Sequence, residues 1–321
     1  MSRNSAPHAL SAIKRRMRNI SMLTQHAVGA IAVFGSLASA AAPPADVAAF
    51  MAIERPQPSA EIRYGPAPTQ AVDVFVPEGV GPHPVAILVH GGCWSVHTAG
   101  REQLRHLGRD LSRQGIAVWS IGYRRANETG GGYPGTYDDV AAAVDLLRTL
   151  GPGLGMDPSR SVLVGHSAGG HLALWAAARA RLPATSPLKM PHPFLPSRVI
   201  SLAGIGDIQA SSAAICGPDI AQRLGASAPS GGQSNPYADV SPAALPPPEA
   251  HVVMVSAQLD RLVAPALAND HVRAMRSKGK ASIDLICIAD AGHFDLVTPG
   301  TGAWDEVLRQ IESALAPGHL R

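Results

Sequence analysis

Short apolar runs alternate along the chain with longer segments that have helical periodicity. Residues 71–76 alternate between apolar and polar positions, which predicts a half-buried strand, and the later apolar runs predict strands buried on both faces. These further strands are predicted at residues 85–89, 116–121, 162–164, 199–202, 251–256 and 283–288, and helices at residues 103–113, 138–150, 170–180, 265–277 and 304–315. Strands that alternate with helices of this length predict an α/β fold, in which helices cover both faces of a mostly parallel sheet.

Residues 204–248 interrupt this alternation. The segment is rich in Gly, Pro, Ser and Ala and lies between two predicted strands. Loops of this length inside compact domains usually contribute to function. We expect a small cap or loop insertion that lies over the functional site.

The first 42 residues have a different composition from the rest of the chain. Five cations precede the first acidic residue, Asp46, and an apolar run follows at residues 27–37, ending in Ala and Ser residues at 38–42. This pattern is typical of a secretory signal peptide and predicts a periplasmic or secreted protein, although an amphipathic or disordered leader is the alternative. The apolar run is shorter than the roughly 20 residues that cross a bilayer, so no stable membrane span is expected. Residues 43–58, rich in Pro and Ala, are expected to be a linker to a single domain at 59–321.

Composition and charge narrow the classes of partner and cofactor. The chain is 46% hydrophobic and 16% charged, which suits one sizeable core. Its net charge of +3 comes from the leader cations, so the remaining chain has no excess of positive charge for nucleic-acid binding. Cys93, Cys216 and Cys287 lack metal-ligand spacing and can form at most one disulfide, and Cys287 is expected to be a buried thiol. We expect no metal and no cofactor; the sequence gives no indication of oligomeric state.

A Gly-x-Ser-x-Gly motif at residues 165–169 provides a candidate nucleophile, Ser167. An apolar strand precedes the motif and an apolar helix follows it, as required where a serine sits on a sharp strand-to-helix turn. Glycines on both sides of the serine avoid clashes in such a turn. The motif occurs easily by chance in a glycine-rich chain, so this context carries the prediction.

A second motif, His90-Gly91-Gly92-Cys93-Trp94, follows the predicted strand at residues 85–89. Two glycines would let the backbone come close to a bound carbonyl group. We therefore predict an oxyanion hole formed by the N–H groups of Gly92, Cys93 and Ala168. Trp94 is a candidate for contact with substrate, as is Phe294 near the end of the chain.

Histidine and carboxylate partners for the serine are expected late in the chain. His293 follows the strand at residues 283–288 and is the candidate general base, and Asp260, just past the strand at 251–256, is the candidate acid. Three other carboxylates lie near His293: Asp284, Asp290 and Asp295. Asp284 lies within a strand, and the other two are too close to His293 in sequence to reach its ring easily.

Together these motifs resemble the α/β-hydrolase superfamily, in its lipase and esterase branch with the His-Gly-Gly motif. The similarity runs from about Tyr64 through Trp304. It implies an eight-stranded, mostly parallel sheet, a Ser167–His293–Asp260 triad and a small-molecule ester substrate. It also implies a structural pair between Arg124 and Asp139.

His-Gly-Gly-x-Trp in place of His-Gly-Gly-Gly is more similar to the aryl (kynurenine) formamidase subgroup and its esterase relatives. This difference affects the expected substrate and leaves the mechanism unchanged. The first alternative is therefore an aryl formamidase acting on N-formyl aryl amines such as N-formylkynurenine, which fits poorly with an exported protein. A non-catalytic binding protein on the same fold is a further alternative, but such proteins typically lose a triad residue.

Overall fold

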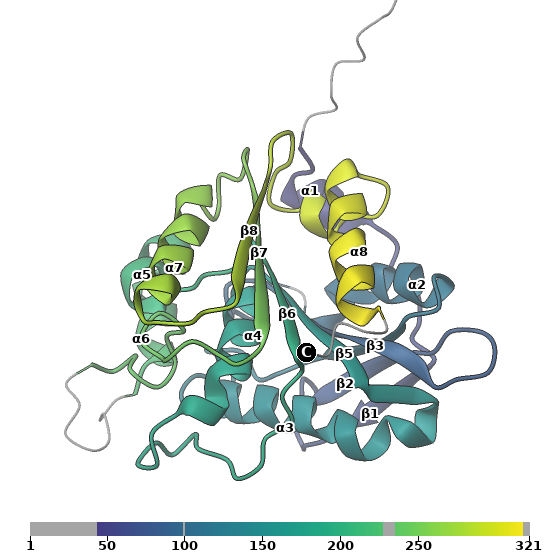
Figure 1. The fold of residues 1–321 in the computed structure, drawn as a ribbon, viewed down its shortest axis with the longest axis horizontal. Helices are drawn as coiled ribbons and strands as arrows, with labels where there is room; N and C mark the ends of the chain where they lie inside the picture. The colour runs from purple at the N-terminus through teal and green to yellow at the C-terminus, as the bar shows by residue number, and fades with distance from the viewer. Residues whose placement is uncertain (1–43, 99, 227–234, 317–321) are drawn as a thin grey trace, which may run out of the picture. The chain divides into compact units, whose positions relative to one another are not determined.

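The computed structural model describes residues 44–98, 100–226 and 235–316, so the predicted signal peptide lies outside the described residues. Their strands form one sheet in the order β1-β2-β4-β3-β5-β6-β7-β8 (Figure 1). Strands β3 to β8 run parallel, whereas β1 and β2 are antiparallel to each other and β2 is antiparallel to β4. The bounds are β1 Ala60–Arg63, β2 Ala71–Phe75, β3 His83–Val89, β4 Ala117–Ile121, β5 Met156–His166, β6 Arg198–Leu202, β7 His251–Ala257 and β8 Ile283–Ile288.

Helices cover both faces of the sheet. Helices α2 and α8 pack on one face, and α3, α4 and α7 pack on the other (Figure 1). The bounds are α1 Val47–Ala52, α2 Arg105–Arg113, α3 Gly135–Leu150, α4 Ala168–Ala178, α5 Ile208–Cys216, α6 Pro218–Leu224, α7 Pro265–Ser277 and α8 Gly302–Leu315. The α/β fold class with a mostly parallel eight-stranded sheet is confirmed.

The central strands of the sheet account for the continuous apolar runs in the sequence. Residues 85–89 of β3 and 162–166 of β5 are buried on both faces, as their continuous apolar runs predict. Because β3, β5, β7 and β8 are parallel, the loops that follow them emerge at the same edge of the sheet. The loops after these four strands carry the candidate residues.

The predicted linker at residues 43–58 contains a docked helix instead. Helix α1 begins after Asp46, whose side chain accepts a hydrogen bond from Ala49 N. Phe50 on this helix is 1% exposed and stacks on Phe294, with ring centroids 4.9 Å apart. The Pro/Ala-rich sequence did not predict this helix, because only one large apolar side chain, Phe50, anchors it and no helical periodicity results. The segment at 204–248 likewise contains two short helices, α5 and α6, that the sequence analysis did not predict.

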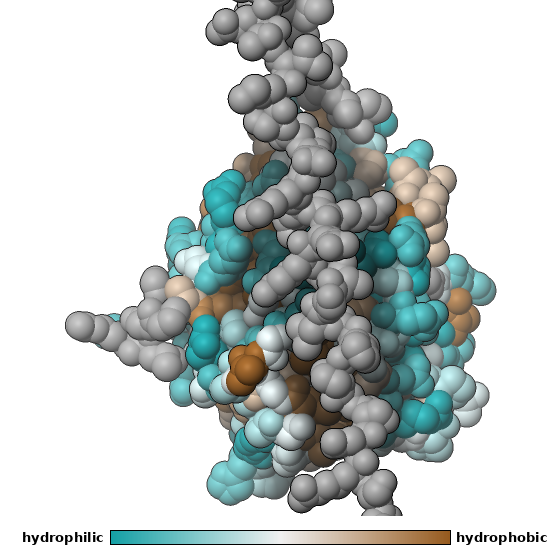
Figure 2. Space-filling view, turned by 90° about the vertical axis from the view of Figure 1, so that its right-hand side faces the viewer, coloured by the Kyte–Doolittle hydropathy of each residue, from teal (hydrophilic) through white to brown (hydrophobic). Residues whose placement is uncertain are grey.

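The visible surface in Figure 2 is mostly hydrophilic, and hydrophobic residues occur on it in small groups. Such scattered apolar side chains are normal for a protein surface. Within the described ranges, no helix combines the length and apolarity needed to cross a bilayer.

We expect Phe50→Ala to lower the free energy of unfolding by about 3 kcal/mol, because it leaves a cavity between α1 and Phe294. Met51 lies on the same helix with its side chain 47% exposed, so Met51→Ala is the matched control and should change stability little. Urea unfolding of both variants measures the difference. Equal small effects would show that α1 is not packed on the domain as described.

Candidate active site

Ser167 lies at the junction of β5 and α4, in a backbone conformation that ordinary residues avoid. Its φ of 55° and ψ of −120° place it outside the usual regions for L-residues. The turn fits only because glycines flank it: a Cβ on Gly165 would lie 2.1 Å from Gly169 O, and one on Gly169 would lie 2.1 Å from Val89 O. Ser167 N donates a hydrogen bond to Leu202 O at 2.8 Å, which fixes the turn against β6. The backbone thus forces the serine side chain out of the strand direction.

The hydroxyl of Ser167 is available for chemistry. The residue is 7% exposed, and its hydroxyl forms no hydrogen bond with any other described residue, His293 included. Bonds of this kind are often long without a substrate and shorten when one binds. Ser167 is also the N-cap residue of α4, where unpaired backbone N–H groups favour negative charge.

His293 and Asp260, the predicted base and acid, lie in direct contact. His293 Nδ1 lies 2.6 Å from Asp260 Oδ2, and both side chains are buried. The other carboxylate oxygen of Asp260 accepts hydrogen bonds from Leu262 N and Val263 N, each at 2.8 Å. Because the carboxylate can only accept, Nδ1 carries the proton and Nε2 is left free to act as a base.

The three rival carboxylates have other surroundings. Asp284 pairs with His251 at 3.2 Å and is largely exposed, and Asp290 is also exposed. Asp295 accepts hydrogen bonds from Gly292 N and Ala45 N, so it fixes the loop that carries His293 and ties it to the start of the described chain. The sequence did not predict this bracing role, for which the only signal was an acidic residue two positions after the candidate histidine.

His166, next to the serine, also holds the His293 loop. Its Nε2 lies 3.1 Å from His293 O, and the two imidazole rings lie 4.5 Å apart. A carbonyl oxygen only accepts, so Nε2 of His166 carries the proton. Burial lowers the pKa of His166 well below its ordinary value, and proximity to His293 lowers it further. His166 is therefore a neutral donor that links the serine turn to the histidine loop.

The loop after β3 brings backbone N–H groups to the serine. A Cβ on Gly91 would lie 2.9 Å from His166 O and 3.1 Å from Ser167 Cβ, so the close approach of this loop favours glycine. Three consecutive residues of the loop have positive φ: Gly92 at 100°, Cys93 at 52° and Trp94 at 49°. In the part of the chain that the structure describes, the N–H groups of Gly92, Cys93 and Ala168 donate to no protein acceptor. Unpaired donors beside a nucleophile are what an oxyanion hole requires.

Trp94 supports this turn from inside the protein. Its side chain is 0% exposed and meets the His171 ring edge-on, with centroids 5.2 Å apart. Trp94 O also accepts a hydrogen bond from Ala126 N at 2.7 Å. The side chain presents no surface to a ligand, so this geometry does not support the predicted substrate contact. Phe294 is partly buried, and its ring lies 5.1 Å from the His293 ring.

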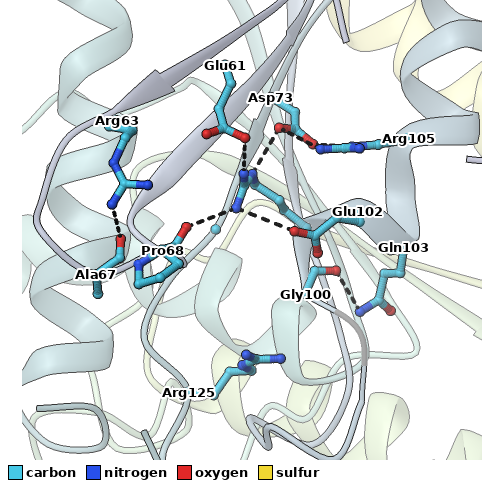
Figure 3. Close-up of polar contacts among 12 residues, drawn as sticks. Glu61, Arg63, Ala67, Pro68, Asp73, Gly100, Glu102, Gln103, Arg105 and Arg125 are labelled. Atoms are coloured by element: carbon cyan, nitrogen blue, oxygen red, sulfur yellow. Dashed lines mark hydrogen bonds and ion pairs between the residues drawn. The ribbon is translucent and has the colours of Figure 1, made fainter. Parts of the chain in front are cut away.

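Ion pairs hold residues 101–105, the segment that follows this turn (Figure 3). Arg101 pairs with Asp73 of β2 and Glu61 of β1, and Arg105 at the start of α2 pairs with the same Asp73. Asp73 is completely buried, so these two guanidinium groups offset the cost of its desolvation. The predicted pair of Arg124 and Asp139 is present as well, with two contacts of 2.7 and 2.8 Å.

The three cysteines differ in their states. Cys93 and Cys216 form a disulfide with a Cα separation of 5.4 Å, which joins the predicted oxyanion loop to the end of α5. Cys287 is a free thiol and is exposed, so the expectation of a buried thiol was wrong. It lies on β8, the last strand of the sheet, where only Ile283 is buried. Among the described residues, no group of three or more His, Cys, Asp or Glu side chains is placed to hold a metal ion.

The buried histidines around the site predict a dependence of stability on pH. Burial lowers the pKa of His171 to about 4, below the ordinary value of 6.5, while its Nε2 lies 2.8 Å from Val240 O. Below pH 6.5 the unfolded chain therefore binds more protons than the folded protein does. The contribution of His171 to the free energy of unfolding is fully present above pH 6.5 and is lost as the pH drops toward 4. The share from His171 alone is about 2 kcal/mol between about pH 7.5 and 5.

The parent protein should lose free energy of unfolding between about pH 7.5 and 5. We expect His171→Gln, which can still donate a hydrogen bond to Val240 O, to reduce this loss by about 2 kcal/mol. Urea unfolding at both pH values measures it. An identical loss in the variant and the parent protein would show that His171 is not buried in its neutral form.

Comparison with known proteins agrees with this geometry. A family model described as BD-FAE matches residues 72–214, which include the predicted oxyanion loop and Ser167. A probable isoprenylcysteine α-carbonyl methylesterase of Oryza sativa subsp. japonica is 35% identical over 111 residues, covering 34% of this chain and 25% of that protein. A carboxylesterase of Mycobacterium tuberculosis is 36% identical over 98 residues, covering 30% of each chain. The chain thus spans about a quarter to a third of the length of these curated relatives.

Solved structures are similar over most of the chain. Esterase B of Lactobacillus rhamnosis, inhibited by a tributyrin phosphonate, has a TM-score of 0.66 at 20% identity, covering 84% of this chain and 90% of that one. A bacterial heroin esterase has a TM-score of 0.60 at 20% identity, covering 84% and 87%. At this identity the likeness shows the fold. The sheet order, the strained serine turn and these similarities together show that the chain has the α/β-hydrolase fold.

Proposed function

We propose that this protein is a serine hydrolase that cleaves small carboxylic esters through an acyl-enzyme on Ser167. The observation that carries the proposal is the 2.6 Å contact between His293 Nδ1 and Asp260 Oδ2, in a loop that also contacts the turn holding Ser167. Nucleophile, base and acid come from three loops at the same edge of the sheet, in the order Ser, Asp, His.

The reaction follows from these positions. Ser167 Oγ attacks the ester carbonyl while His293 Nε2 takes its proton, and Asp260 stabilises the imidazolium that forms. The unpaired N–H groups of Gly92, Cys93 and Ala168 would receive the negative charge on the carbonyl oxygen. His293 then gives its proton to the leaving alcohol. In the second half of the reaction, His293 activates a water molecule that releases the acid and restores Ser167.

The named relatives favour esters over N-formyl amides. They are a methylesterase and a carboxylesterase, and the similar solved structures are esterases. The residues that match the formamidase-like pattern, His90 to Trp94, form a turn that both classes would need. A partly buried Phe294 beside His293 is the side chain that we assign to contact with the ester's acyl or alcohol group.

We also propose that the protein is exported, with residues 1–42 as its signal peptide. The basic start, the short apolar run and the small residues at 38–42 support this proposal. The disulfide between Cys93 and Cys216 supports it independently, because such bonds persist mainly in oxidising compartments.

We expect Ser167→Ala to lower kcat for p-nitrophenyl acetate by at least about a thousandfold, because it removes the nucleophile. Ser120→Ala is the matched control: this serine is also buried, and its hydroxyl forms no hydrogen bond within the described chain. Its activity should stay close to that of the parent protein.

A series of p-nitrophenyl esters from acetate to decanoate, with N-formylkynurenine as a comparison, then identifies the preferred substrate. Turnover should be highest with the short esters. Faster turnover of N-formylkynurenine than of every ester would contradict the proposed substrate class, whereas full activity in Ser167→Ala would contradict the mechanism.

A further inference from the structure

The turn that carries the proposed oxyanion donors is strained. Gly92, Cys93 and Trp94 all have positive φ, and the last two have side chains that disfavour it. A side chain in this conformation strains the backbone, which persists only where its surroundings hold it. The position of Cys93 N–H therefore depends on contacts that keep the turn from relaxing.

Most of those contacts act on the residues to either side of Cys93. Gly92 O accepts hydrogen bonds from Ser95 N and from Thr98 Oγ1, each at 3.0 Å. Trp94 is fixed by its buried ring and by the hydrogen bond from Ala126 N. Cys93 itself is tied by the disulfide to Cys216, 123 positions further along the chain.

The partner of Cys93 lies in a segment that is anchored at its two ends. At its start, the side chain of Asp207 caps α5, and Ala243 N donates to Gly206 O. At its end, Tyr137 donates its hydroxyl hydrogen to Leu224 O. Between these anchors, the last turn of α5 buries little: Ala213 and Ala214 are exposed and Ile215 is half-buried.

We propose that Cys216 is a positioning residue for the oxyanion hole, and that turnover depends on the Cys93–Cys216 bond remaining oxidised. The bond joins the strained turn at Cys93 to the weakly packed end of α5. It therefore restricts the movement of both segments. Reduction by a dithiol gives two cysteine thiols and the oxidised cyclic disulfide of the reductant. Both cysteines are only half-buried, which leaves the bond accessible to a small reductant. This inference rests on the serine hydrolase function proposed above.

The test compares the oxidised protein with the same protein reduced by dithiothreitol without denaturant, with free thiols counted to verify reduction. We expect reduction to lower kcat for p-nitrophenyl acetate by about tenfold or more, because losing an oxyanion donor outright typically costs about 10²–10³. KM should change by less than about threefold, because the donors act mainly on the transition state. Labelling of Ser167 by a fluorophosphonate should slow in parallel.

Two variants separate positioning from stability. Cys216→Ser should have the lowered kcat of the reduced protein and should not respond to dithiothreitol. Cys287→Ser, the matched control, removes the exposed thiol and should keep both the full kcat and its loss on reduction. Thermal unfolding shows whether each sample is folded at the assay temperature.

The outcomes distinguish this inference from the function on which it rests. An unchanged kcat in a folded, fully reduced protein overturns the inference and leaves the serine hydrolase intact, even if the melting temperature falls. An oxidised protein that neither turns over esters nor labels at Ser167 overturns the proposed function itself. If Cys216→Ser does not fold, the reduced parent protein still decides the question.

Discussion

The site depends on the close approach of three backbone segments: the end of β3, the end of β5 and the start of α4. Gly165, Gly169 and Gly91 line this contact, and a Cβ at any of them would meet atoms at 2.1 to 2.9 Å. The approach allows β5 to turn into α4 within one residue, with Ser167 at a positive φ. Because the sheet is buried on both faces, the packing of its central strands can hold this strain.

Each loop that carries a candidate catalytic group has its own attachment. Backbone N–H groups at Leu262 and Val263 hold Asp260, and the side chain of Asp295 holds the loop of His293. On the oxyanion side, Tyr123 donates to His90 O, and its ring stacks on the His90 imidazole at 4.2 Å. Burial lowers the pKa of His90 to about 4, as it does for His171, so these supports stay uncharged near neutral pH.

The central fold could be predicted from the sequence because burial on both faces leaves a continuous apolar run. β1 was missed because it is a four-residue strand at the edge, with only alternate positions half-buried. α1 was missed because one aromatic side chain anchors it in a Pro/Ala-rich segment. The order of Ser167, Asp260 and His293 along the chain could be proposed because this fold is associated with one order. The burial of Trp94 depends on its packing against α4, which no local sequence pattern predicts. The partner of Cys93 could not be chosen between the other two cysteines without knowing which of them lies close to it.

The proposed function requires that an acyl group is transferred to Ser167. The most direct test is to mix the protein with a p-nitrophenyl ester, quench with acid within the first turnovers, and locate the acyl mass by peptide mass spectrometry. We predict the added acyl mass on the peptide that contains Ser167, together with a burst of p-nitrophenol. Ester turnover with the acyl group on another residue, or with no acyl-enzyme and no burst under any quench condition, would contradict it.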